Sequence, residues 1–430
     1  MRAVIRKIAE GVVVAAIAVV VTLLALEFVV FRTILVPDDL LPNKTINGVV
    51  RYKPHTVATF RQPDGTTTRV AINAQGWNSK HGTYKTERTD GVARIAVVGD
   101  SYVHNRFVEI SDTFTARLET GLNARGTKAE VFRFGMDGAP LSQYLHVLRR
   151  EVVNYRPDVV IVPLIHNDFD EMYRGLKSRY ASSFMKLRKT TDGEVAEVAP
   201  GTFRPGLADK LRASAAFRYL YYETNLYIHA KSWINRLYWG GSEEWDPAFI
   251  SSAVDIRKVN DHESNRFFAR YVLREMKALS QEHGFRLIIA MDGVRDAIYD
   301  GRKPMDYEIG RLNRIARDLT AELGLTFVDF HDTFARDYAL HRKRFEFSYD
   351  WHWNERANRL VAETLEPLVV QALRPTVQRK TVMLSSQRMP RVPGLREKPA
   401  GAECAEKSKP ADQKTAGVSE APPLPARRKS

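Results

Sequence analysis

The chain has 430 residues, of which 44% are hydrophobic, so it is long enough to bury a core in one large or two modest domains. Its single cysteine, Cys404, excludes an intramolecular disulfide framework and any cysteine-rich metal site. The net charge is +14, but residues 374–430 alone hold 13 Lys or Arg against 5 Asp or Glu. Because the remaining charge is spread along the chain without a compact basic patch, nucleic-acid binding is not expected.

Residues 11–31 form the first predicted element. The run contains one charged residue, Glu27, and follows a basic stretch with Arg2, Arg6 and Lys7. About 20 apolar residues cross the hydrocarbon core of a bilayer, and a basic flank stays in the cytoplasm. The pattern predicts an uncleaved single-pass anchor in the cytoplasmic membrane, with residues 1–10 in the cytoplasm and the rest of the chain outside. A cleaved signal peptide and a buried helix of a soluble protein are the alternatives; no small-x-small cleavage site follows the run.

Residues 32–90 are expected to form a linker and a small β element. Pro37 and Pro42 end the preceding helix. Runs rich in β-branched residues predict three short strands at 49–52, 56–60 and 68–72. The turn residues Pro63-Asp64-Gly65 predict a hairpin between the last two strands.

Residues 91–373 alternate between strand and helix patterns. Strands are predicted at 95–98, 129–134, 159–164, 286–291 and 326–330, and helices at 113–125, 141–154, 267–283, 307–323 and 355–371. This alternation predicts an α/β domain with a parallel sheet covered by helices on both faces. An insertion at about 169–261 is expected to be helical and is rich in aromatic residues, which either pack onto the core or form a binding surface for sugar rings.

Polar residues follow three of these strands, and another group precedes the last helix. Gly99-Asp100-Ser101 ends the first strand, Gly138 follows the second, Asn167 follows the third, and Asp350-Trp351-His352 follows the fifth. Because ligands bind outside the carboxyl ends of parallel strands, we expect these groups to converge. A hydroxyl, an imidazole, a carboxylate and N–H donors are the groups that nucleophilic acyl chemistry requires.

In this order the four blocks resemble those of the SGNH, or GDSL-like, hydrolases, over residues 90–371 apart from the insertion. The resemblance implies a three-layer, flavodoxin-like fold and ester hydrolysis or acyl transfer. It makes Ser101 the nucleophile, His352 the base and Asp350 the carboxylate that orients the imidazole. It places the oxyanion hole at the backbone N–H groups of Ser101 and Gly138 and at the side-chain amide of Asn167. The Asp-x-His-Trp-Asn form resembles a branch that includes polysaccharide-modifying members.

Two positions depart from the family pattern. The third block usually reads Gly-Asn-Asp, and His166 stands in place of the glycine, either as a hydrogen-bonded loop residue or as a contact to substrate. The acid precedes the histidine by two residues where three is commoner, which leaves Asp332 as an alternative partner for the imidazole. His104, close after Ser101, either lines the pocket or lies on the surface.

The sequence therefore predicts a membrane-anchored serine esterase of the SGNH type that acts on O-acyl groups, such as acetyl, of envelope or extracellular carbohydrate. A polysaccharide O-acyltransferase using the same Ser101, Asp350 and His352 is one alternative, and a non-catalytic envelope scaffold is another. No metal or cofactor is expected, because the remaining histidines lack metal-ligand spacing. The expected partners are an ester substrate and the membrane. Residues 374–430, basic and rich in proline, are expected to be a disordered tail.

Overall fold

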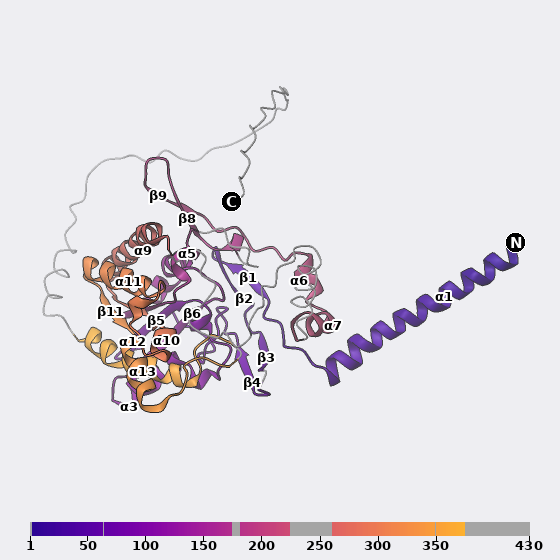
Figure 1. The fold of residues 1–430 in the computed structure, drawn as a ribbon, viewed down its shortest axis with the longest axis horizontal. Coiled ribbons are helices and arrows are strands. Elements are labelled where there is room, and N and C mark those ends of the chain that lie inside the picture. Colours follow the sequence, from indigo (N-terminus) through magenta and orange to yellow (C-terminus); the bar gives the residue numbers. More distant parts are fainter. Residues whose placement is uncertain (1, 63, 174–180, 224–259, 349, 375–430) are drawn as a thin grey trace, which may run out of the picture. The chain divides into compact units, whose positions relative to one another are not determined.

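The computed structural model describes residues 2–62, 64–173, 181–223, 260–348 and 350–374 (Figure 1). The chain divides into two units, Met1–Arg374 and Pro375–Ser430, and all the described residues belong to the first. The predicted basic tail and the aromatic residues Tyr227, Trp233, Tyr238, Trp239 and Trp245 of the insertion lie outside the described residues.

A five-stranded parallel sheet forms the centre of the domain. Its strands are β5 (Ala93–Gly99), β6 (Ala129–Gly135), β7 (Val159–Leu164), β10 (Arg286–Met291) and β11 (Thr326–Asp329). They are arranged in the order β11-β10-β7-β5-β6, with all neighbours parallel. Numbered along the chain this is the order 2-1-3-4-5 of flavodoxin-like sheets, so the predicted α/β class and all five predicted strands are confirmed.

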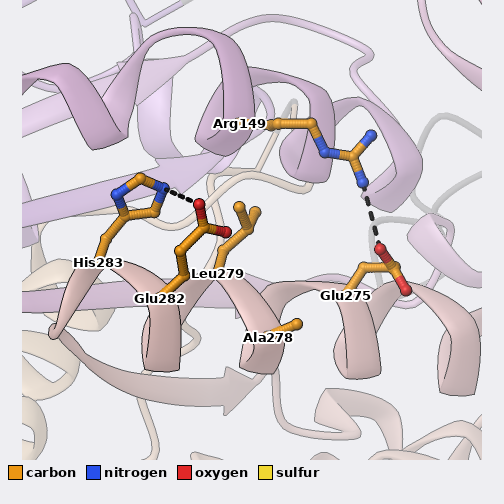
Figure 2. A pocket seen from close by; sticks show the side chains of 6 residues that line it. All are labelled: Arg149, Glu275, Ala278, Leu279, Glu282 and His283. Atoms are coloured by element: carbon orange, nitrogen blue, oxygen red, sulfur yellow. Dashed lines mark hydrogen bonds and ion pairs between the residues drawn. The ribbon is translucent and has the colours of Figure 1, made fainter. Parts of the chain in front are cut away.

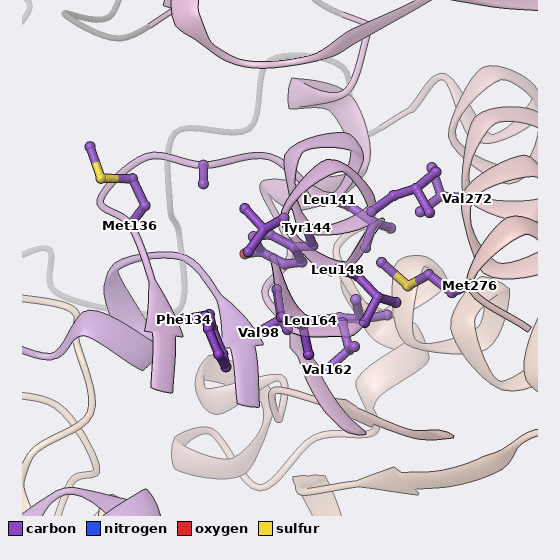
Figure 3. Packing of buried hydrophobic residues seen from close by; sticks show 14 of the residues in the cluster. Val98, Phe134, Met136, Leu141, Tyr144, Leu148, Val162, Leu164, Val272 and Met276 are labelled. Atoms are coloured by element: carbon purple, nitrogen blue, oxygen red, sulfur yellow. The ribbon is translucent and has the colours of Figure 1, made fainter. Parts of the chain in front are cut away.

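Alternate residues of the central strands enter two separate hydrophobic clusters, one on each face of the sheet. Val98 belongs to the first cluster and Val97 to the second, as the two-residue period of a strand requires. Helices α4 (Leu141–Arg150), α9 (His262–His283) and α11 (Gly310–Leu323) contribute to the first cluster, part of which Figure 3 shows. Helices α3 (Phe114–Ala124), α12 (His331–His341) and α13 (Glu355–Leu373) contribute to the second. The domain is therefore a three-layer sandwich with helices on both faces of the sheet.

The predicted long helices are confirmed with small shifts of their ends, and α12 was not predicted. Several short helical elements connect them, and some of these follow the strand ends that carry the candidate site. The short elements are α2 (Ser101–His104), η2 (Ile110–Asp112), η3 (Val152–Tyr155), α5 (Asp168–Glu171), η4 (Ala181–Ser183), α6 (Leu207–Leu211), α7 (Ala215–Arg218), η5 (Tyr219–Glu223), α10 (Arg295–Tyr299) and η6 (Pro304–Asp306).

The small β element contains two hairpins rather than the three strands expected. Strand β3 (Val57–Arg61) pairs with β4 (Thr67–Ala71), which confirms the predicted hairpin. Strand β2 (Val49–Tyr52) pairs with a strand that the sequence interpretation missed, β1 (Asn43–Ile46). The turn between them is Asn47-Gly48, both with positive φ (54° and 75°). Asn-Gly is a strong signal for a two-residue hairpin turn, so the sequence contained a local signal for the strand that was missed.

The insertion is not wholly helical, which corrects the expectation for this segment. Among its described residues, β8 (Lys186–Lys189) and β9 (Val195–Val198) form an antiparallel hairpin. Gly193, with a φ of 83°, lies in the loop between them. Glycine adopts this left-handed conformation without strain, which allows the chain to reverse here.

The N-terminal segment is one long apolar helix. It consists of α1 (Arg2–Ala25) followed by η1 (Leu26–Ile34), which has the wider π-helical hydrogen bonding. By length and composition the stretch Val4–Ile34 is able to cross a membrane, as an anchor or as a signal sequence. None of its most apolar window is buried against the protein, which contradicts the alternative of a buried helix in a soluble core.

Candidate active site

Ser101 lies at the turn between β5 and α2. Asp100 precedes the helix, and its Oδ1 accepts a hydrogen bond from the backbone N of Tyr102 at 2.8 Å. The turn requires glycine at position 99, because a Cβ there would lie 2.4 Å from Cγ2 of Val103. The short strand, the glycine and the capping aspartate together place the hydroxyl of Ser101 at the carboxyl edge of the sheet.

The structure brings Ser101, His352 and Asp350 together in one hydrogen-bonded row. Nε2 of His352 lies 2.7 Å from Oγ of Ser101, although the two residues are 251 positions apart. Nδ1 of His352 is hydrogen bonded to Oδ1 of Asp350, which also accepts from the backbone N of His352 at 2.8 Å. Asp350, and not Asp332, is thus the carboxylate in contact with the imidazole. Because Asp350 accepts at Nδ1, the neutral ring presents an unprotonated Nε2 to the serine.

A buried network holds the segment that carries Asp350 and His352. The backbone oxygen of Trp351 accepts hydrogen bonds from the hydroxyl of Tyr102 (2.9 Å) and from Nη1 of Arg295 (2.8 Å). Arg295 is fully buried and forms ion pairs with Asp292 (3.2 Å) and Glu346 (3.1 Å). The sequence interpretation missed Arg295, although its place just after β10, at the same edge of the sheet as Ser101, was an available signal.

The segment is anchored a second time through Trp353. Its indole Nε1 donates to Oδ1 of Asp292 at 3.0 Å, and its ring is buried. Trp353 also forms an isolated antiparallel bridge with Glu346. The residues on both sides of His352 are therefore fixed to the protein interior.

Aromatic rings surround the imidazole of His352. Phe107 is stacked on it with ring centroids 4.6 Å apart, and Tyr102 lies at 4.8 Å. Trp351 is stacked at 6.0 Å and is 39% exposed, so this residue beside the imidazole is partly open to solvent. The guanidinium of Arg106 lies over the ring of Phe107 at 5.0 Å. The site is thus bordered by flat apolar surfaces and one cation.

Gly138 and Asn167 follow the strands on either side of β5. Gly135 pairs with Gly99 in the sheet, so Gly138 and Ser101 leave neighbouring strands at the same level. Gly138 has a φ of 67°, and Asn167 directly precedes α5. Both residues lie at the edge of the sheet that carries Ser101, while their role as oxyanion donors remains a prediction.

Two buried carboxyl groups close the turns that carry these residues. Burial raises the pKa of Asp100, next to Ser101, to about 8. Burial and the neighbouring charge of Asp100 raise the pKa of Asp168, next to Asn167, well above its ordinary value. Asp168 accepts hydrogen bonds from the hydroxyl of Tyr144 and from the backbone N of Ile165, both at 2.8 Å. These contacts hold the turn at Asn167.

His166 is buried, and its Nε2 lies 2.8 Å from Oδ1 of Asn313. Burial lowers its pKa to about 4, so the ring is neutral near neutral pH. The structure therefore favours the interpretation of His166 as a hydrogen-bonded loop residue over that of a contact to substrate.

His104 is also buried, so the alternative of a surface position is wrong. Its Nδ1 lies 2.7 Å from Oδ1 of Asp137 and 3.0 Å from the hydroxyl of Tyr52. Burial raises the pKa of Asp137, but the adjacent His104 and Arg106 outweigh burial and hold it well below its usual range. His104 thus binds the residue that precedes Gly138, and it links the small β element to the candidate site.

A separate pocket lies between α4 and α9 (Figure 2). The residues that line it are Arg149, Glu275, Ala278, Leu279, Glu282 and His283. It contains none of the predicted site residues. Within the described part of the chain, no cluster of three or more His, Cys, Asp or Glu side chains has the arrangement of a metal site.

Comparisons with known proteins leave the family of this chain open. No protein-family model matches the chain, and no curated protein matches it by sequence. Among solved structures, the acetyl xylan esterase AlAXEase is 13% identical, with a TM-score of 0.36 over 64% of this chain and 99% of its own. A lipolytic G-D-S-L protein from Veillonella parvula is 11% identical, with a TM-score of 0.33 over 65% and 99%. A catalytic mutant of Axe2, an acetylxylan esterase from Geobacillus stearothermophilus, is 11% identical, with a TM-score of 0.36 over 68% and 100%. At these TM-scores the similarities do not assign an activity to this chain.

Proposed function

We propose that this protein is a serine-dependent ester hydrolase of the SGNH type, which forms a covalent acyl-enzyme on Ser101. The row of hydrogen bonds from Asp350 through His352 to Ser101 supports this proposal more than any other observation. A serine hydroxyl is a weak nucleophile unless a neighbouring base removes its proton, and the base needs a third group to orient it. The three side chains have the contacts that these roles require.

The reaction begins when Oγ of Ser101 attacks the carbonyl carbon of the ester and its proton passes to Nε2 of His352. Asp350 holds the ring in place and stabilises its positive charge. Negative charge develops on the former carbonyl oxygen, where we assign the backbone N–H groups of Ser101 and Gly138 and the amide of Asn167 as donors.

The intermediate collapses as the bond to the alcohol oxygen breaks, and His352 returns the proton to that oxygen. The acyl group then remains on Ser101. A water molecule attacks it, giving a proton to His352, and the carboxylic acid is released as Ser101 regains its hydrogen.

We further propose that the substrate is an acylated carbohydrate of the cell envelope. The partly exposed Trp351 beside His352 supports this assignment, because flat aromatic side chains bind the apolar faces of sugar rings. The long N-terminal apolar helix supports a location at the cytoplasmic membrane, which it would cross as an uncleaved anchor with the catalytic domain outside.

The test follows acetate release from an activated acetyl ester, using the detergent-solubilised full chain. Ser101→Ala, His352→Ala and Asp350→Asn are each expected to lower kcat by about 10⁴-fold or more. Asn167→Ala is expected to lower it by about 10²–10³-fold, the typical effect of losing one oxyanion donor. Ser182→Ala, at an exposed serine outside the site, is the matched control and should leave kcat unchanged.

The same assay separates the other functions of this site. Transfer of acetyl to an added oligosaccharide, lost in Ser101→Ala, would identify an acyltransferase. If a serine-directed fluorophosphonate labels wild type and Ser101→Ala equally, and neither hydrolyses esters, the catalytic proposal fails and a scaffold remains.

A further inference from the structure

Glu27, the charged residue within the apolar N-terminal run, is bound by the insertion. Its Oε2 accepts hydrogen bonds from Oγ of Ser214 (2.8 Å) and from the backbone N of Ala216 (3.0 Å). Its Oε1 accepts from the backbone N of Ala215 at 2.9 Å, and Arg32 forms an ion pair with the same oxygen at 3.0 Å. Three of these four partners therefore lie 187–189 residues further along the chain.

Two further contacts hold the insertion against this end of the helix. The rings of Phe31 and Tyr219 lie 5.4 Å apart, and Phe31 is buried. Nε of Arg218 donates to the backbone oxygen of Asp38 at 3.0 Å. Figure 1 shows α7 beside the place where the N-terminal helix ends, with α6 next to α7. Residues 27–38 thus pack against residues 214–219 of the insertion, and we call this the docked contact.

The position of Glu27 along the helix sets the level of this contact in a membrane. Gly11 begins the uncharged run, and Glu27 follows 16 residues later. At about 1.5 Å per residue, this places the carboxylate about 24 Å further along the helix. The hydrocarbon core is about 30 Å thick, so Glu27 reaches the outer boundary of the core, or lies just inside it. The residues that bind Glu27 must meet it at that level.

Helix α6, just before these residues, presents apolar side chains to its surroundings. Leu207 is 74% exposed and Leu211 is 46% exposed, and residues four positions apart lie on the same face of a helix. Arg204 and Lys210 nearby are exposed as well. Exposed leucines with basic neighbours are typical of segments that lie in the interface of a bilayer. Nη1 of Arg218 donates at 3.0 Å to the backbone oxygen of Arg212, the residue that follows α6, and this bond links the end of α6 to the docked helix α7.

We propose that residues 204–221 form a second membrane contact, which lies in the outer interface of the bilayer and is held there by Glu27. Leu207 and Leu211 enter the acyl region, and Arg204 and Lys210 meet lipid phosphates. The partner is the phospholipid surface itself. The inference rests on the proposed membrane-spanning anchor and is independent of the esterase chemistry.

The experiment uses the full chain in vesicles of phosphatidylcholine and phosphatidylglycerol. In a Cys404→Ser background, Leu207→Cys and Leu211→Cys are each labelled with the environment-sensitive fluorophore NBD. The matched control is Leu340→Cys on α12, an exposed leucine (79%) on an element outside the docked contact. The labels at 207 and 211 are expected to emit at shorter wavelength than the control, to be quenched by spin-labelled lipid and to be protected from aqueous iodide.

Three variants test the hydrogen bonds at Glu27 and the two exposed leucines. Glu27→Ala is expected to shift the emission at position 211 toward that of the control, whereas Arg6→Ala, at the exposed other end of the helix, should not. Leu207→Ser combined with Leu211→Ser should abolish the lipid contact and leave hydrolysis of a soluble ester unchanged.

Labels at 207 and 211 that are as accessible to iodide as the label at 340 would overturn the inference. An alkaline carbonate wash of the vesicles separates the two possible causes. If the chain stays in the membrane, only the second contact fails; if the chain is released, the anchor fails and the inference with it. Loss of esterase activity alone would contradict neither the second membrane contact nor the anchor.

Discussion

Replacing Arg295 by methionine tests whether the buried network at the site supports the segment that carries Asp350 and His352. The side chain of Arg295 is completely buried, as are the carboxylates of Asp292 and Glu346 with which it pairs. Burial lowers the pKa of Arg295, but the two carboxylates outweigh burial and raise it well above its ordinary value. Methionine has a similar length and leaves Asp292 buried without its cation, whereas Glu346 keeps its ion pair with Arg344 at 3.2 Å.

The expected cost follows from these contacts. Removing one partner of a buried ion pair typically costs about 3–5 kcal/mol, because the remaining charge is left uncompensated. Tyr102→Phe removes a hydroxyl from the same network, but its two partners keep others: Arg295 retains Asp292, and the oxygen of Trp351 retains Arg295. That variant should therefore cost only about 1 kcal/mol, the usual net value of one hydrogen bond. If the network supports this segment, Arg295→Met should therefore lower the free energy of unfolding several times more than Tyr102→Phe does.

Urea unfolding of the detergent-solubilised chain, followed by tryptophan fluorescence, measures both losses. Arg314→Met, at an exposed arginine of α11, is the matched control and should change stability by less than about 0.5 kcal/mol. Ester hydrolysis should fall in Arg295→Met, because the oxygen of Trp351 then loses a donor. If Arg295→Met unfolds at the same urea concentration as Arg314→Met, the network does not stabilise the site and the reasoning is refuted.

Three further predictions concern buried groups near the site. Burial lowers the pKa of His166 to about 4, so the unfolded state takes up the proton first as the pH falls, and the free energy of unfolding should fall by about 3 kcal/mol between pH 6.5 and 4. In His166→Gln, the urea midpoint should fall less over the same pH range. Burial raises the pKa of Asp100 to about 8, so the folded state keeps a proton that the unfolded state releases near pH 4, and stability should fall as the pH rises from about 4 to about 8. An Asp100→Asn variant whose stability changes with pH as steeply as that of wild type would contradict this assignment. A Cβ at Gly135 would lie 2.2 Å from the backbone N of His104, so Gly135→Ala should lower stability by about 1–3 kcal/mol, while Gly82→Ala, which has open space, should leave the thermal midpoint unchanged.

Patterns within a few residues were sufficient to predict most of the fold. The run ending at Gly99 is apolar and β-branched, so burial on both faces of a parallel sheet was readable from the sequence. The strand β1 was missed although Asn47-Gly48 is itself a turn signal, so the local sequence was sufficient to predict this strand. The hairpin β8–β9 was missed because its strands are only four residues long and three of their four exposed positions carry charged residues.

The sequence by itself determined which residue types stand at the carboxyl ends of the strands, and therefore that Ser101, Gly138, Asn167 and His352 share one edge of the sheet. That inference needs only the rule that parallel strands share a direction. Only the tertiary structure decided which side chains touch. Tyr102 meets Arg295 across 193 residues, and Glu27 meets Ser214 across 187. Such contacts depend on where long connections return in space, and a local pattern of hydrophobicity carries no information about that path.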